Sequence, residues 1–105
     1  MSAWSALLLA GLCEIAWALG LKYSDGFTRL WPSVGTAIAM ALSFGLMSIS
    51  LRSLPFGTAY AIWTGIGAAG SIIVGIAMFG ESMDAFRMLC LSLIVAGMIG
   101  LRAAT

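Results

Sequence analysis

The stretch that decides the fold is AWSALLLAGLCEIAWALGL, residues 3–21. It is uncharged except for one acidic residue, Glu14, which lies near its centre. As an α-helix it would extend about 28 Å at about 1.5 Å per residue, which is close to the thickness of the hydrocarbon core of a bilayer. We therefore expect this stretch to cross a membrane and to place a carboxyl group near the midplane.

Three further apolar runs follow, at residues 32–51, 57–79 and 86–103. Hydrophobic residues make up 62% of the chain and charged residues only 9%, whereas soluble domains carry about a quarter charged residues. The sequence predicts an all-α membrane protein, with residues 1–105 forming a single domain of four transmembrane helices. The first run lacks the basic leader of a cleavable signal peptide, and no basic tail suggests a nucleic-acid partner.

The positive charges are balanced between the two faces of the membrane. Four spans place Arg52, Arg102 and the terminal amine on one face, and Lys22, Arg29 and Arg87 on the other. Orientation normally follows an imbalance of Lys and Arg, which this chain lacks. One interpretation is that the chain inserts both ways round and forms an antiparallel homodimer, which is an inverted repeat built from two molecules. The alternative is that its context selects one orientation.

An ionisable residue inside a span is by default a candidate functional residue, so the neighbours of Glu14 matter. Gly11 and Trp17 share its helical face, where Gly11 would leave space and the indole N–H would find the carboxylate as acceptor. In the second span Ser43 lies near the midplane, with Met40 on the same stripe. The Ser43 hydroxyl is expected either to bond a carbonyl of its own helix or to bond the carboxylate.

The third span is the most polar of the four. Tyr60, Trp63, Thr64 and Gly67 follow the i, i+3, i+4, i+7 spacing of one helical face. Such a stripe is more often core, but two rings with polar groups inside lipid favour a cavity wall. Gly65 and Gly67 would permit this helix to bend, or simply to pack closely.

The fourth span carries a stripe that suits close helix packing. Cys90, Leu93, Ile94 and Gly97 repeat at helical spacing and combine small with aliphatic side chains. This pattern is typical of an interface between protomers. Packing within one chain would explain it almost as well.

The residue types also limit the chemistry. The chain has no His and no Cys–Cys or Cys–His cluster, so neither a transition-metal site nor a cofactor is expected. No nucleophile–base pair is present, so we do not expect an enzyme. An acidic pocket with aromatic walls suits a cation, and a buried carboxyl also takes up a proton more readily. A guanidinium would fit best because it donates two parallel N–H bonds to a carboxylate.

Several motifs resemble the small multidrug resistance family along the whole chain. They are CEIAWA at 13–18, LKY at 21–23, GFTRLWPS at 26–33 and GTAYAIWTGIGA at 57–68. The resemblance implies an antiparallel homodimer that exchanges protons for cations across the bacterial inner membrane. It also implies that Glu14 is the family's membrane-embedded glutamate, that Tyr60 and Trp63 belong to the binding site, and that Gly97 is the dimer glycine.

The subtype is indicated by three positions. Trp17 and Ser43 are similar to the guanidinium-exporting branch, while the branch that exports polyaromatic drugs typically has an aromatic residue in place of Met40. Guanidinium or guanylurea would then be the substrate. Quaternary ammonium export, pairing with a sister protein and a non-transporting role in a larger membrane assembly are the alternatives.

Overall fold

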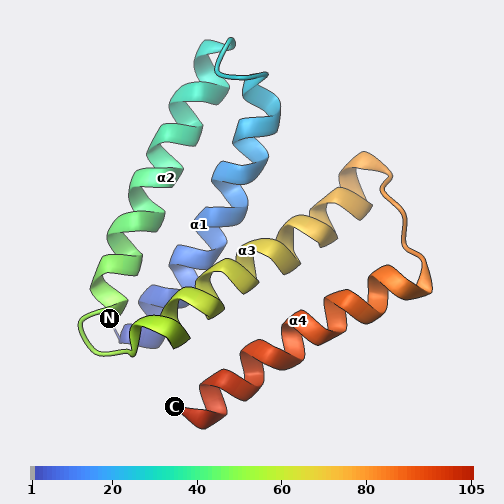
Figure 1. The fold of residues 1–105 in the computed structure, drawn as a ribbon. Helices are drawn as coiled ribbons and strands as arrows, with labels where there is room; N and C mark the ends of the chain where they lie inside the picture. The colour runs from blue at the N-terminus through green and yellow to red at the C-terminus, as the bar shows by residue number, and fades with distance from the viewer. Residues whose placement is uncertain (1) are drawn as a thin grey trace.

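The computed structural model describes residues 2–105, and all regular structure in that range is helical. Four helices follow one another, α1 (Ala3–Ser24), α2 (Leu30–Ser50), α3 (Phe56–Phe79) and α4 (Ala85–Ala104) (Figure 1). Each is long and apolar enough to cross a membrane. The prediction of an all-α protein with four such helices is confirmed.

Local hydrogen bonds set the helix ends. The Ser2 side chain accepts the N–H of Ser5 at the start of α1, and the Asp84 side chain accepts the N–H of Arg87 at the start of α4. Gly80 ends α3 with a φ of 64°, a left-handed conformation that glycine adopts without strain. The connection between α3 and α4 therefore meets both of its helices at capped ends.

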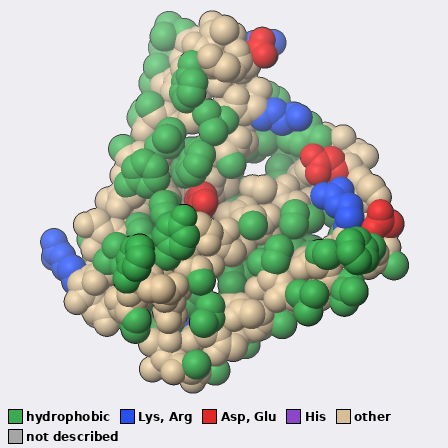
Figure 2. All heavy atoms as spheres, viewed as in Figure 1, with side chains coloured by type: hydrophobic (Ala, Val, Ile, Leu, Met, Phe, Trp, Pro, Cys, Tyr) green, Lys and Arg blue, Asp and Glu red, His purple; other side chains and the backbone are tan. Residues whose placement is uncertain are grey.

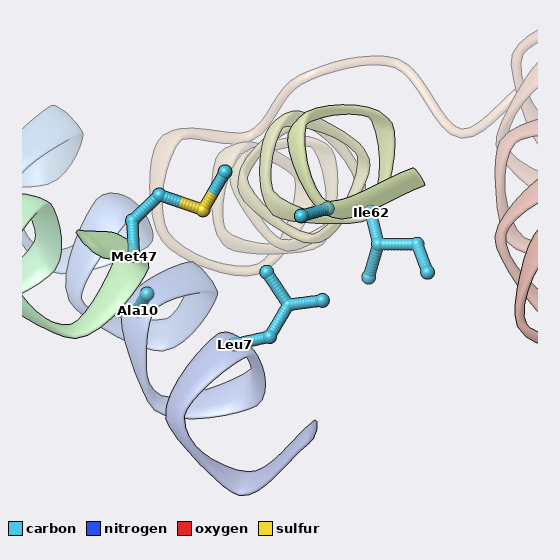
Figure 3. Packing of buried hydrophobic residues seen from close by; sticks show 5 residues of the cluster. Leu7, Ala10, Met47 and Ile62 are labelled. Atoms are coloured by element: carbon cyan, nitrogen blue, oxygen red, sulfur yellow. The ribbon is translucent and has the colours of Figure 1, made fainter. Parts of the chain in front are cut away.

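The helix α1 is the centre of the arrangement. It packs along α2 and crosses α3, whereas the backbone of α4 lies close to that of α3 alone (Figure 1). The core where α1, α2 and α3 meet consists of Leu7, Ala10, Met47, Ala59 and Ile62, most of which are labelled in Figure 3. Within residues 85–104 no residue is buried, so α4 leaves most of its surface open.

Glycines allow α1 to lie close to its neighbours. A Cβ atom at Gly70 would overlap the side chain of Ile15, and one at Gly20 would overlap Thr36. Close approach through small residues is the usual way in which membrane helices gain packing contacts. This packing brings the middle of α1, with its acidic residue, against the middle of α3.

Candidate functional site

Glu14 lies in the middle of α1 and faces α3. Its carboxyl group rests against Gly67, where an added Cβ would lie 2.6 Å from the Glu14 Cδ atom. The Oε2 atom is buried and has no hydrogen-bond partner among residues 2–105. Figure 2 shows one acidic side chain isolated among apolar and uncharged atoms, while the other acidic side chains lie near the ends of the molecule. The structure therefore presents an unpartnered carboxylate oxygen near the middle of a helix that is long and apolar enough to span a membrane.

The expectation that Gly11 leaves space beside the carboxyl group is wrong. An added Cβ at Gly11 would lie 2.7 Å from the Cβ of Ile66, so the side chain of α3 fills that position. The space beside Glu14 comes instead from Gly67. Gly11 serves the contact between α1 and α3, because that is the side of α1 on which the two helices cross.

Both expectations for the Ser43 hydroxyl are also wrong. It donates to the backbone carbonyl of Ala10 on α1 at 2.7 Å, and bonds neither its own helix nor Glu14. It also accepts the indole N–H of Trp63 on α3 at 3.0 Å. The reason is that α2 packs directly along α1, which buries Ser43 against the turn that precedes Glu14.

Trp17 does not bond the carboxylate as expected. Its Nε1 atom is buried without a partner in the described part of the chain. The ring packs edge-to-face on Phe44 of α2, with centroids 6.5 Å apart. The Trp17 N–H and the Glu14 carboxylate oxygen therefore both lack hydrogen-bond partners, although the two residues lie about one turn apart on α1.

Phe44 belongs to the site, and the sequence analysis did not select it. Its ring contacts both Trp17 and Trp63, the latter at 5.9 Å between centroids. Tyr60 extends this cluster, with its ring 5.9 Å from that of Trp63 and its side chain 50% exposed. The signal that could have identified Phe44 is an aromatic residue directly after the polar Ser43 in an apolar span.

The remaining site candidates also lie on α2 and α3. Met40 is half-buried on α2. The Thr64 hydroxyl donates to the Tyr60 carbonyl of its own helix at 2.8 Å. An added Cβ at Gly65 would lie 2.7 Å from the Met98 sulfur, so Gly65 lets α4 approach α3. The helix α3 is continuous through Gly65 and Gly67.

The stripe on α4 divides into two parts. Cys90 and Ile94 are half-buried, while the Leu93 side chain is 63% exposed. Around Gly97 no other part of the described chain comes within 4 Å of an added Cβ. Packing within the chain therefore does not account for Leu93 and Gly97.

The chemistry available at the site follows from these groups. A buried carboxylate oxygen without a donor lies on the same helix as Trp17, whose ring joins the cluster of Phe44, Trp63 and Tyr60. The faces of aromatic rings attract cations, and the carboxylate supplies the matching charge. Within residues 2–105 no group of His, Cys, Asp or Glu is arranged to hold a metal ion. The arrangement can bind an organic cation.

Comparisons with known proteins identify relatives of this chain. The model of the Small Multidrug Resistance protein family matches residues 2–94. A guanidinium exporter from Citrobacter freundii is 57% identical over 102 residues, which cover 97% of this chain and 97% of that protein. A guanidinium exporter from Proteus vulgaris is also 57% identical over 97% of this chain. One from Yersinia pseudotuberculosis is 56% identical over 98% of this chain and 99% of its own length.

Proposed function

Because the chain belongs to the Small Multidrug Resistance family, we propose that it exports guanidinium and small substituted guanidinyl cations in exchange for protons. It is a multi-pass membrane protein, and the bacterial inner membrane is the compartment that fits its relatives. Relatives named as guanidinium exporters cover almost all of the chain. The substrate class is taken from them, and the mechanism below from the geometry of the site.

The observation that carries the proposal is the unpartnered Oε2 atom of Glu14. Buried polar atoms in proteins nearly always have a hydrogen-bond partner, so an orphan acceptor is a place for a ligand that donates. A guanidinium is planar, remains charged and donates parallel N–H bonds that match a carboxylate. Because Gly67 has no side chain, the carboxyl group can lie directly against α3 at this position.

Competition for this one carboxyl group would couple the two fluxes. A proton on Glu14 removes the charge that attracts the cation, and a bound cation disfavours protonation. If the site opens to one side of the membrane at a time, a cation leaves when a proton arrives. The aromatic rings of Trp63, Tyr60 and Trp17 would form walls around the cation, and Ser43 would hold Trp63 in place through the indole N–H.

The proposed working unit is an antiparallel homodimer. Leu93 and Gly97 present an open surface on α4, and small residues are what close contacts between membrane helices require. The balanced Lys and Arg residues of the two faces are compatible with insertion in both orientations. Two inverted copies would present the same site to the two sides in turn.

The test is transport by the purified protein in liposomes. A guanidinium gradient should drive opposite proton movement in the wild type, and Glu14→Gln should abolish both this movement and proton release on cation binding. Glu81→Gln is the matched control, since Glu81 lies in the loop before α4, and it should transport normally.

Other outcomes separate the alternatives. Proton movement driven by bulky quaternary ammonium ions but not by guanidinium would assign the other substrate class. Absence of any cation-driven proton movement in the folded wild type would overturn the exporter proposal and favour a non-transporting subunit.

A further inference from the structure

A groove of about 670 Å³ runs along the flank of α4 that faces α1. It exists because the backbone of α4 lies close to that of α3 alone, and among the described residues α4 reaches α1 only through side chains such as Arg102 on Trp4. Its walls are apolar and come from three helices. They are formed by Leu7 and Leu8 of α1, Ile62 and Ile66 of α3, and Met98 and Ile99 of α4.

One end of the groove is cationic and polar. The guanidinium of Arg102 lies over the ring of Trp4, 5.1 Å from its centroid, and both line the groove. At the same end the hydroxyls of Thr58 and Thr105 lie 3.3 Å apart. Within residues 2–105 the ion pair is Arg87–Glu81, so no carboxylate side chain neutralises Arg102.

The acidic residues of the loops lie at the other membrane face. Asp25 follows α1, and Glu81 and Asp84 lie between α3 and α4. The face that holds Arg102 instead carries a second cation, Arg52, in the connection between α2 and α3. This face therefore attracts anions, and its positive charge is not compensated by Asp or Glu.

All four helices are long and apolar enough to span a bilayer, so we expect a groove between them to be accessible to lipid. Its α3 wall is formed by Ile62 and Ile66, which lie about 6 Å apart along the helix axis, and the apolar lining continues away from the cationic end. A cationic group at the membrane surface above an apolar channel is complementary to a molecule with an anionic headgroup and a hydrocarbon chain. We infer that the groove binds an anionic phospholipid, with its phosphate at Arg102 and an acyl chain along the apolar walls.

The groove is separate from the surface proposed for the dimer. At about 100° per residue, Arg102 lies about 140° around α4 from Gly97. The partner chain would contact the Leu93 and Gly97 side, while Met98 and Arg102 remain on the side toward α1. A lipid and a second copy can therefore occupy different flanks of the same helix.

A photo-crosslinking experiment in anionic vesicles distinguishes the two occupants. Benzoylphenylalanine replaces Ile99, which is 67% exposed and lines the groove, or Leu93, which is 63% exposed on the other flank. We expect the probe at position 99 to capture a phospholipid, detected as a mass increase of one lipid. We expect the probe at position 93 to capture a second copy. Capture of a second copy from position 99 would overturn the inference.

The headgroup preference is tested with vesicles of phosphatidylglycerol or phosphatidylcholine. A basic residue near the surface favours an anionic lipid by about fivefold. The yield of crosslinked phosphatidylglycerol should exceed that of phosphatidylcholine by this factor in the wild-type background, and Arg102→Gln should remove the difference. Arg52→Gln is the control, since Arg52 lies on the same face but outside the groove lining, and it should preserve the preference.

Equal yields of the two lipids in the wild type would contradict the assignment. Neither readout depends on transport, so failure here leaves the exporter proposal intact.

Discussion

The Ser43 hydroxyl joins three helices around the acidic residue. It lies on α2, donates to Ala10 of α1 and accepts from Trp63 of α3. Ser43→Ala removes both bonds and leaves a buried indole N–H without its acceptor. A hydrogen bond of this kind contributes about 1 kcal/mol, so we expect guanidinium to bind about fivefold more weakly, measured by calorimetry in detergent.

Ser92→Ala provides the control for this measurement. Its hydroxyl donates to the Met88 carbonyl of its own helix on an exposed face of α4. The affinity of this variant should equal that of the wild type. Unchanged affinity in Ser43→Ala would show that the indole position does not affect cation binding.

Gly67 keeps the carboxyl group of Glu14 in place by having no side chain. In Gly67→Ala the new Cβ would lie 2.6 Å from the Glu14 Cδ, so the carboxyl group must move. Overpacking of this kind costs about 1–3 kcal/mol, and we expect cation affinity to fall at least fivefold. The control is Gly35→Ala on α2, where an added Cβ has no neighbour within 4 Å in the described chain. Equal affinities in the two variants would contradict this role.

Sequence reasoning identified the acidic residue but misassigned its neighbours. Glu14 could be selected because a charge inside an apolar run is costly wherever the helices lie. The space beside the carboxyl group comes from Gly67 and not from Gly11, which serves the contact between α1 and α3. The sequence of one helix does not determine how α1 is rotated against α3. The partner of Ser43 is a backbone carbonyl, and no pattern of side chains could indicate it.

The first turn of α4 depends on one titrating side chain. The Asp84 carboxylate accepts the N–H of Arg87 at 2.8 Å, and this bond, with a second from Ser82, lowers the pKa of Asp84 below 3.8. Because the pKa is lowered in the folded state, the ionised Asp84 cap stabilises the folded state fully above pH 3.8. This stabilisation is lost as the pH falls through the folded value.

Asp84→Asn isolates this effect, because asparagine caps a helix without titrating. In detergent, the difference between the melting temperatures of wild type and variant should be constant around neutral pH. Below pH 3.8 the wild type should lose stability relative to the variant. A constant difference down to pH 2.5 would mean that the cap does not contribute to stability.

Hydropathy located the four helices because the hydrocarbon thickness sets the length of each apolar run. It did not locate their ends. The helix α1 continues beyond residue 21 to Ser24, because its hydrogen bonds run on through Lys22, whose ammonium group lies 4.4 Å from the ring centroid of Phe79. A long cationic side chain can leave the apolar region while its backbone remains helical.

Assembly of two chains should depend on the open side of α4. Gly97→Ile adds a branched side chain where the described chain has no atom nearby, so a single chain should fold normally. We expect the variant to lose the close helix contact and to dimerise at least tenfold more weakly, measured by energy transfer between labelled copies in liposomes. Gly35→Ile on α2 should dimerise like the wild type. Dimerisation of both variants at the wild-type level would place the interface elsewhere.

The contact from Trp63 through Ser43 to Ala10 also constrains how the transporter can move. In an α-helix the carbonyl of residue 10 accepts the N–H of residue 14. The Ala10 carbonyl therefore accepts both the Ser43 hydroxyl and the backbone N–H of Glu14. Displacing the α1 backbone at Glu14 from α2 would break the Ser43 bond. If the proposed exchange moves these helices, we expect α1, α2 and α3 to shift together at this junction.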